Sequence, residues 1–257
     1  MIHKKMQGQK VFCRFGPWYR HNKEEFYGRK IIWDRRRAGG AGLLTLKAKE
    51  VLENTKVIAC PVKEPGEKST ALSIISQVID LSEKEIIEVV FKMAKDKAVR
   101  QQCRKEAAQL LTEFLDRDMD IAMITLGDVS VYSTYTYVNQ MVHQLGYDTE
   151  IIPGIPSFCS GAALAQVSLV EGNESLGVIS SLKGTSSLEA MLDRFDNLVV
   201  MKAGSHMKEI ADILEARHLL EHTTVLSNVG MADAYIGPMD TARDYGYFTT
   251  LIIKRGE

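Results

Sequence analysis

The sequence lacks the marks of membrane proteins and of disulfide-bonded proteins. Its apolar runs, such as Ile121–Ile124, fall far short of the roughly 18 residues that cross a bilayer. It holds only four cysteines in 257 residues, and no two of them form a C-x-x-C pair, which argues against a zinc ribbon and a redox dithiol. We therefore expect a protein of the reducing cytoplasm, with no membrane partner and no signal peptide.

Several catalytic motifs are also missing. The sequence shows no Ser-His-Asp arrangement, no Walker loop and no G-x-G-x-x-G fingerprint, and the AGGAG stretch at residues 38–42 is too generic to stand for one. These absences argue against hydrolysis and hydride transfer. A transferase that aligns two substrates needs no strong nucleophile, because orientation alone removes much of the reaction barrier.

Histidine offers one pair with the spacing of metal ligands. His218 and His222 are four residues apart and would share one face of a helix. The alternative is a cationic last turn of a helix, which the helix dipole favours. Because no third ligand lies nearby in the sequence, we expect no metal site.

Positive charge is concentrated at the start of the chain. Residues 1–37 hold eleven Lys or Arg against three acids, whereas the whole chain has a net charge of −1. Aromatic residues such as Phe12, Trp18 and Tyr19 are interleaved with these cations, as in proteins that bind RNA by phosphate neutralisation and stacking. We keep RNA binding as an alternative hypothesis. We nevertheless expect no nucleic-acid partner, because a local shift of reading frame would also produce this basic segment.

From Leu43 onward, helical and extended patterns alternate, which predicts an α/β protein. We expect a basic, poorly ordered head at residues 1–25, an N-terminal α/β domain at 26–150 and a C-terminal α/β domain at 151–257. The predicted helices span residues 43–54, 99–116, 130–145, 186–195 and 206–220. The predicted strands span residues 56–61, 86–91, 120–126, 176–180, 197–203, 223–230 and 247–255.

Local signals sharpen several of these elements. Thr45 is a candidate cap for the first helix, and Gly146 is placed to end the third. Pro61 predicts the end of the first of these strands. The run at 120–126 is apolar throughout and predicts a central strand buried on both faces. Two prolines predict that residues 149–158 are extended.

Glycine-containing turns directly follow three predicted strands. They are Leu126-Gly127-Asp128, the turn at 201–204 and the turn at 228–230. In open α/β sheets, ligands bind beyond the carboxyl ends of the strands, where glycine lets the backbone approach them closely. These turns, together with the PGIPSF segment, therefore predict a ligand site.

Long stretches of the chain resemble the tetrapyrrole methylase family. The resemblance rests on TLGDVSVYSTYTYV, EIIPGIPSFCSGAA, LGVISS, FDNLVVMKAG and YFTTLIIKR, and it runs from about Gly42 to Lys254. GLLTLKAKEVLENTKVIACP and the VVFKM segment agree with the branch of the family that methylates C20 of precorrin-2 in cobalamin biosynthesis. The resemblance implies a two-domain α/β fold with a cofactor cleft between the domains, in a cytoplasmic homodimer.

The resemblance also implies S-adenosyl-L-methionine as the cofactor. Carried over motif by motif, the residues expected to bind it are Leu126, Gly127, Asp128, Val131, Ser157, Phe158, Met201 and Gly230. For Phe158 and Met201, simple core packing is the alternative interpretation.

The implied substrate is a large, carboxylate-rich tetrapyrrole, namely precorrin-2 or cobalt-precorrin-2. Lys92, Lys183 and Lys202 are candidate partners of its carboxylates, with solvated surface lysines as the alternative. Tyr135 is a candidate substrate contact and a conceivable general base. We assign no catalytic residue.

The sequence departs from the family in two places. Val129 stands where the family has a proline after the Gly-Asp turn, and IIWDRRRAGGAG stands where it has a loop of the form GxGPGDP. The second change gives two hypotheses: a catalytically impaired, tetrapyrrole-binding homologue, or a local shift of reading frame or misread start. A frame shift would explain both the abrupt end of the resemblance and the cationic head.

The frame-shift hypothesis makes a prediction at the level of the DNA. If it holds, the adjacent frame across codons 28–42 encodes a loop of the form GxGPGDP, and the basic head is not a selected RNA-binding element. Sequencing the coding DNA checks this directly. An adjacent frame without such a loop would mean that the altered loop is a genuine feature of the chain.

Overall fold

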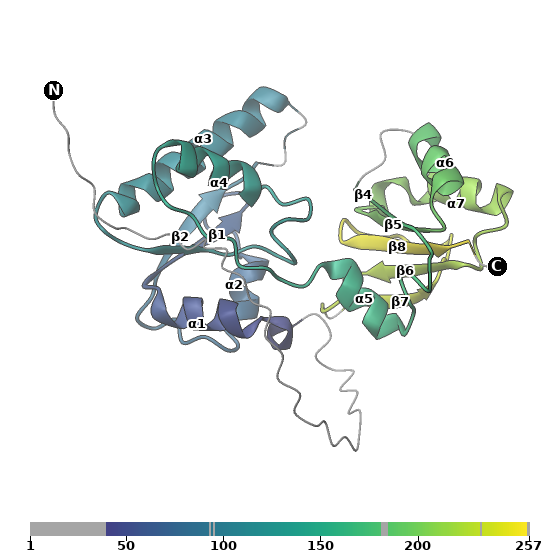
Figure 1. Ribbon diagram of the computed structural model, residues 1–257, viewed down its shortest axis with the longest axis horizontal. Coiled ribbons are helices and arrows are strands. Elements are labelled where there is room, and N and C mark those ends of the chain that lie inside the picture. The colour runs from purple at the N-terminus through teal and green to yellow at the C-terminus, as the bar shows by residue number, and fades with distance from the viewer. Residues whose placement is uncertain (1–39, 93, 95, 181–184, 232, 256–257) are drawn as a thin grey trace, which may run out of the picture. The chain divides into compact units, whose positions relative to one another are not determined.

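A computed structural model describes residues 40–92, 94, 96–180, 185–231 and 233–255 of the chain (Figure 1). These residues form two compact units, Leu43–Gly154 and the residues from Ile155 onward with 40–42. The expected head at 1–25 lies outside the described residues, and the domain boundary at 150/151 stays a prediction. Among the described helices, none is long and apolar enough to span a membrane.

The first unit is a parallel sheet with helices on both faces. Its strands have the order β2-β1-β3, and β1 pairs in parallel with both neighbours. The strands are β1 (Val57–Val62), β2 (Glu85–Val90) and β3 (Ile121–Met123). The helices are α1 (Leu46–Asn54), α2 (Thr70–Ile75), α3 (Lys97–Leu115) and α4 (Tyr135–Gln144), and a 3₁₀ turn (Ala41–Leu43) precedes them.

Strand β1 supplies the centre of both cores of this unit. Ile58 and Cys60 point to the face covered by α1 and α2, where they pack with Leu52. Ala59 points to the opposite face and packs with Leu111 of α3 and Val138 of α4. Figure 1 shows these two helix pairs on opposite sides of the sheet. The alternation of side chains along one strand thus produces a three-layer unit.

The predicted ends of two helices are confirmed. The Thr45 hydroxyl accepts a hydrogen bond from the Ala48 N–H at 3.2 Å, so it caps α1. Gly146 follows α4 with a φ of 94°, the left-handed conformation that glycine adopts without strain. Helix α4 nevertheless begins at Tyr135 rather than at 130, because the segment before it turns through Tyr132 with a φ of 50°.

Two predictions about the strands are wrong. Pro61 does not end β1, which continues to Val62. The Val62 carbonyl accepts from the Phe91 N–H on the β2 side of the strand, and the Ala59 carbonyl accepts from the Ile124 N–H on the β3 side. Because backbone groups alternate sides along a strand, Pro61 faces the β3 side, beyond the last residue pair with β3. Its missing N–H therefore costs no ladder hydrogen bond.

Among the described residues, the apolar run at 120–126 forms an edge strand and not the predicted central strand. In the described sheet, β3 lies at an edge and has three half-buried residues, whereas β1 is the central strand. Apolar character predicts burial against a neighbouring layer, but it does not report how many strands flank the segment.

The second unit is a mixed five-stranded sheet in the order β4-β5-β8-β6-β7. Strands β4 and β5 are parallel, and β8 runs antiparallel to both β5 and β6. The strands are β4 (Leu176–Ser180), β5 (Asn197–Met201), β6 (Thr223–Ser227), β7 (Tyr235–Pro238) and β8 (Thr249–Lys254). The helices are α5 (Ser157–Ala165), α6 (Thr185–Arg194) and α7 (Met207–Ala216), with a 3₁₀ turn (Gly204–His206) before α7.

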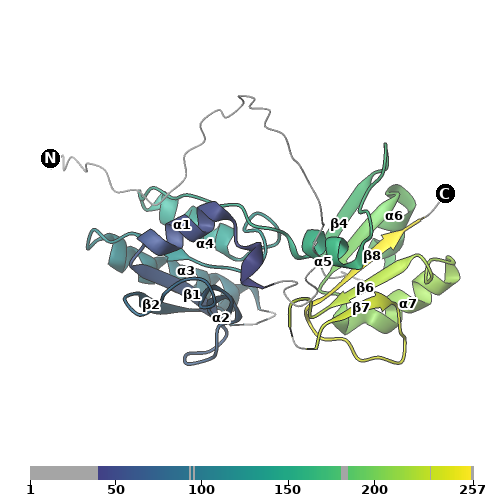
Figure 2. The same ribbon diagram turned by 90° about the horizontal axis from the view of Figure 1, so that it is seen from below.

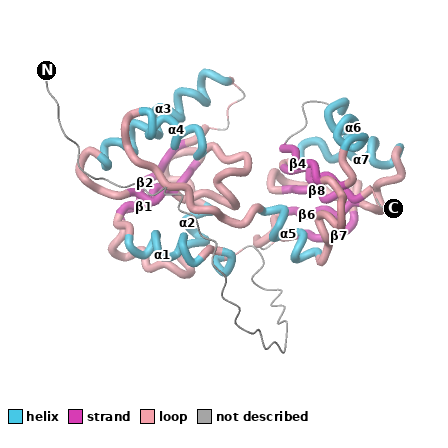
Figure 3. Tube along the Cα trace, in the orientation of Figure 1, coloured by secondary structure: helices cyan, strands magenta, loops and turns pink. Residues whose placement is uncertain are grey.

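The helices of this unit cover both faces of its sheet. Leu192 of α6 and Leu214 of α7 pack on Val200 and Leu251, whereas Gly161 of α5 contacts Leu226 from the other face. Figures 2 and 3 show α6 and α7 on the side opposite α5. The sequence predicted neither α5 nor β7, and it also missed α2 in the first unit.

Two further predictions need correction. The segment at 149–158 was expected to be extended and not helical, and it carries no helix through Pro156, but α5 begins at Ser157, because a proline just before a helix is compatible with its first turn. His218 and His222 do not share a helix face, since α7 ends at Ala216 and His218 has a φ of 57°.

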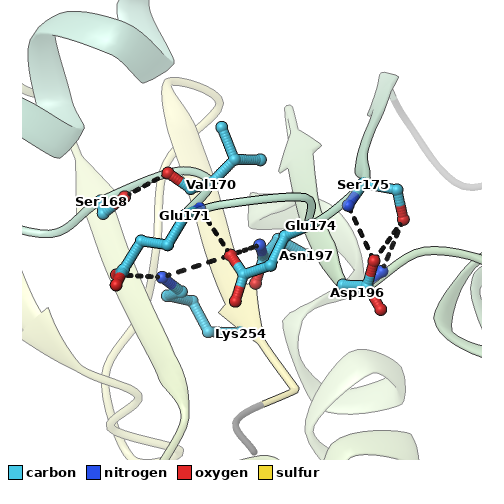
Figure 4. A network of polar contacts seen from close by, with 8 residues as sticks. All are labelled: Ser168, Val170, Glu171, Glu174, Ser175, Asp196, Asn197 and Lys254. Carbon is cyan, nitrogen blue, oxygen red and sulfur yellow. Dashed lines mark hydrogen bonds and ion pairs between the residues drawn. The ribbon is translucent and has the colours of Figure 1, made fainter.

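A polar network holds the loop before β4 against the sheet (Figure 4). The Lys254 ammonium lies 3.0 Å from a carboxylate oxygen of Glu171. The Ser175 hydroxyl and N–H both donate to Asp196, and these bonds lower the pKa of the Asp196 carboxyl. The network lies where β4 and β5 begin and β8 ends, at the opposite end of these strands from the carboxyl ends of β4 and β5.

Two leucines of α1 provide a matched test of this fold. Leu52 is 4% exposed and packs on the sheet, whereas Leu46 is 86% exposed. We expect Leu52→Ala to lower the free energy of unfolding by about 2–5 kcal/mol, because it leaves a cavity. Leu46→Ala should change it by less than about 0.5 kcal/mol. Chemical denaturation of both variants checks this, and equal losses would contradict the placement of α1.

Candidate functional site

The turn after β3 is organised by one buried carboxylate. Asp128 is 9% exposed. Its Oδ1 accepts from the Ser130 N–H at 2.8 Å and from the Ser130 hydroxyl, and its Oδ2 accepts from the Gly154 N–H at 2.8 Å. One side chain therefore ties the Gly-Asp turn to the Pro153-Gly154 segment, which is 26 residues away in sequence.

Glycine is required on both sides of this connection. Gly127 has a φ of 71°, a left-handed conformation. A Cβ on Gly154 would lie 2.2 Å from the carbonyl oxygen of Gly127, so only a residue without a side chain allows the two backbones to come this close. The sequence pointed to Gly127 through its motif, but not to the close packing at Gly154.

The environment of Asp128 favours its charged form. Burial opposes ionisation, but the hydrogen bonds donated by Ser130 and by the Gly154 N–H outweigh it, so the pKa of Asp128 lies below its ordinary value. The carboxylate is thus a fixed anionic acceptor that shapes the turn. With both oxygens occupied by protein donors, we infer a positioning role rather than proton transfer.

The other predicted residues of this turn flank the carboxylate. Leu126 is 39% exposed, and the Val131 N–H donates to the Asp128 carbonyl at 3.2 Å. Val129, which stands at the family's proline position, is buried, and its carbonyl accepts from the Thr136 hydroxyl at 3.1 Å. The turn is therefore closed by hydrogen bonds without the proline.

In the second unit, two predicted turns share one edge of the sheet. Both β5 and β6 run antiparallel to β8, so their carboxyl ends lie together. Lys202 after β5 and Asn228 after β6 are left-handed, with φ values of 58° and 50°, and Gly230 has a φ of 89°. The N–H groups of Ala203 and Asn228 donate to the start of β8 and the residue before it, at 2.9 Å in each case.

This edge brings together the residues predicted from the two turns. Met201 ends β5 half-buried, and Gly230 is exposed. A Cβ on Gly204 would lie 2.1 Å from the carbonyl oxygen of Gly246, so the turn after β5 packs directly on the segment before β8. Left-handed glycine at the carboxyl end of a strand leaves the backbone accessible to a ligand.

Aromatic side chains that the sequence analysis did not select border the same edge. Tyr247 and Phe248 are 48% and 45% exposed, and their rings meet edge to face with centroids 5.2 Å apart. The Lys202 ammonium lies 5.7 Å from the Tyr247 ring centroid. The sequence signal for this pair was two adjacent aromatics before an apolar strand. The same pattern is also typical of the buried end of a strand, so it did not mark a site.

The remaining predicted residues are placed as follows. Ser157 is the exposed first residue of α5, and Phe158 is 8% exposed, which is the burial of a core residue. The Tyr135 hydroxyl donates to Asn139 on the same helix at 3.4 Å. Lys92 is exposed after β2, and Lys183 lies outside the described residues. Within the described ranges, no cluster of three or more His, Cys, Asp or Glu could hold a metal ion.

Comparisons with known proteins agree on one family. The family described as Tetrapyrrole (Corrin/Porphyrin) Methylases matches residues 38–242. A probable cobalt-precorrin-2 C(20)-methyltransferase of Methanocaldococcus jannaschii is 37% identical over 179 residues, which are 70% of this chain and 74% of the relative. The cobalt-precorrin-2 C(20)-methyltransferase of Salmonella typhimurium is 27% identical over 84% of this chain and 92% of its own.

A solved structure shares the fold. The uroporphyrin-III C-methyl transferase of Thermus thermophilus, solved in complex with S-adenyl homocysteine, superposes with a TM-score of 0.60. The match covers 84% of this chain and 93% of that protein at 16% identity, and at such identity it establishes the fold alone. The expected α/β methylase fold is confirmed.

Replacing Asp128 tests the connection that it makes. Asp128→Asn keeps the shape but loses a carboxylate oxygen as acceptor, so we expect the free energy of unfolding at pH 7 to fall by about 1–3 kcal/mol. Because the folded pKa is lowered, the stabilisation is present above the unfolded pKa of about 3.9 and is lost as the pH falls through the folded pKa. The difference between wild type and variant should thus be constant above about pH 5 and shrink below it. Denaturant titrations from pH 7 to pH 3 measure this.

The control for this experiment is Asp148→Asn, since Asp148 is exposed. That variant should differ from wild type by less than about 0.5 kcal/mol. A loss for Asp128→Asn no larger than that of the control would contradict the structural role of the carboxylate.

Proposed function

This chain belongs to the tetrapyrrole methylase family, whose match spans residues 38–242, and from that membership we propose that it methylates C20 of precorrin-2 or cobalt-precorrin-2 in cobalamin biosynthesis. One observation carries the proposal: the family match includes the turns after β3, β5 and β6, which hold the candidate ligand-binding backbone. Both relatives are named as cobalt-precorrin-2 C(20)-methyltransferases, one of them as probable.

The proposed cofactor is S-adenosyl-L-methionine. The residues that would bind it in the first unit are Leu126, Gly127, Asp128 and Val131, and those in the second are Ser157, Phe158, Met201 and Gly230. Support comes from the exposed left-handed backbone at Gly127 and Gly230, which offers polar main-chain groups without a side chain in the way. When bound, the cofactor supplies a methyl group already activated by its positively charged sulfur.

The protein's part in the reaction is alignment. The methyl acceptor is a ring carbon that attacks in line with the carbon–sulfur bond and then loses its proton. Asp128 fixes the turn after β3 by hydrogen bonds from two segments of the protein itself, which favours a single conformation of the turn. No side chain is assigned as the base for the departing proton.

The proposed substrate contacts are the candidate cations and Tyr135. Lys92 and Lys202 lie after β2 and β5, where a carboxylate-rich ligand at the strand ends would meet them. Lys183 remains a candidate from the sequence alone. We also propose that the enzyme is a cytoplasmic homodimer.

Titration and labelling test the proposal together. We expect calorimetry to detect binding of S-adenosylmethionine or S-adenosylhomocysteine, and Asp128→Ala to weaken it by about tenfold, because the turn loses its anchor. Incubation with precorrin-2 or cobalt-precorrin-2 and methyl-labelled cofactor should add one labelled methyl group at C20. Mass spectrometry and NMR locate the label.

The outcomes separate the alternatives. A folded protein that binds no cofactor at millimolar concentration would favour the catalytically impaired homologue. Methylation of uroporphyrinogen instead would assign the chain to another branch of the family.

A further inference from the structure

The first two turns of α3 carry a stripe of three cations. Lys97, Arg100 and Arg104 are spaced three and four residues apart, so they lie along one face of the helix. Lys97 and Arg100 are exposed. Throughout the ranges that the structure describes, no carboxylate lies within ion-pair distance of any of the three. The nearest acid in the sequence, Asp96, uses its carboxylate to cap the helix at the Ala98 N–H, at 2.7 Å.

Arg104 is held in position by an aromatic side chain of the neighbouring helix. Its guanidinium carbon lies 3.7 Å from the ring centroid of Tyr137 in α4, and that ring is 48% exposed. The Arg104 Nε is buried and has no hydrogen-bond partner among the described residues. Stacking fixes the plane of the guanidinium, and the partnerless Nε shows that no described residue competes for that side of the group.

The fold places this stripe at the edge of the sheet where ligands bind. Helix α3 follows β2 and α4 follows β3, and both strands run parallel to β1. The first turns of both helices therefore lie at the carboxyl edge of the sheet, which is also the edge of the Asp128 turn (Figure 1). Lys92, which follows β2, adds a fourth cation at this edge.

The three cations of the stripe together suit a ligand that carries several negative groups. Like charges at these spacings on a helix repel one another, and within the described chain no carboxylate forms an ion pair with them. A planar guanidinium with free donors matches a carboxylate in a bidentate geometry. A ligand that bears several carboxylates around a ring satisfies both requirements at once.

We propose that Lys97, Arg100 and Arg104 bind carboxylate side chains of the tetrapyrrole substrate, and that Tyr137 orients Arg104 for this contact. The inference rests on the proposed function, since it names the part of the substrate that this stripe recognises. It assigns substrate binding to the helix after β2 and leaves cofactor binding to the glycine turns.

The same helix offers a matched control. Arg117, just beyond the last turn of α3, also stacks on an aromatic ring, with its guanidinium carbon 5.0 Å from the Phe114 centroid. It lies at the opposite end of the helix, away from the carboxyl edge. Removing its charge changes the net charge of the protein by the same amount as removing that of Arg104.

Porphyrin binding tests the proposal. The probe is uroporphyrin, a stable tetrapyrrole rich in carboxylates, titrated by fluorescence into wild type, Arg104→Gln, Arg100→Gln, Arg104→Lys and Arg117→Gln. We expect Arg104→Gln to raise the Kd about tenfold or more and Arg100→Gln to raise it less, because only Arg104 is preorganised. Arg104→Lys should recover part of the affinity, and Arg117→Gln should stay within about twofold of wild type.

Kinetics and cofactor binding complete the design. With the natural substrate, Arg104→Gln should raise KM while kcat stays within about twofold, as expected when binding away from the reacting carbon is lost. The affinity for S-adenosylhomocysteine should not change. Thermal unfolding confirms that each variant is folded, and Arg100→Gln, at an exposed position, provides a readout if Arg104→Gln is unstable.

Each outcome decides between the two proposals. Equal uroporphyrin affinity for wild type, Arg104→Gln and Arg100→Gln, or equal losses for Arg104→Gln and Arg117→Gln, would overturn the assignment of this stripe. Wild type that binds S-adenosylhomocysteine but not uroporphyrin would overturn it while leaving the proposed function in place. Uroporphyrin binding that depends on Arg104, in a protein that binds no cofactor, would support the stripe and reject the methyltransferase.

Discussion

The candidate site of the first unit depends on the hydrogen bonds of Asp128. Its carboxylate joins the turn after β3 to the backbone at Gly154, and the absence of a side chain at Gly154 allows the two segments to meet. An ionised carboxylate is suited to this role, because it accepts several hydrogen bonds at once and each is stronger than a neutral one. The exposed backbone of the turn is thereby held in one conformation by the protein's own groups.

The second unit obtains rigid turns by different means. The turn after β5 and the turn after β6 are both hydrogen-bonded to the segment that leads into β8, and Gly204 packs directly on Gly246. The Ser227 and Thr249 hydroxyls add a buried hydrogen bond of 2.9 Å between β6 and β8. Here the central antiparallel strand fixes both turns, so left-handed residues such as Lys202 are tolerated at the sheet edge.

How much the sequence predicted depends on whether the controlling interaction is local. The Thr45 cap, the left-handed Gly146 and the glycine turns were predictable, because each follows from the residue and its immediate neighbours. The edge position of β3 and the continuation of β1 through Pro61 were not, because both depend on which strand pairs alongside. The stacking of Arg104 on Tyr137 joins residues 33 positions apart, and no local pattern marks it.

The two kinds of recognition in the first unit place different demands on the sequence. A backbone turn needs particular residues, since only glycine fits at Gly154 and only a carboxylate satisfies three donors from two segments. Neutralising a carboxylate at a helix surface needs only a cation within reach, and Lys or Arg can approach from several positions. Arg104 is the exception along its stripe, because a ring beneath it fixes its direction. Arg104 therefore differs from the other cations of the stripe in its fixed orientation and not in its charge.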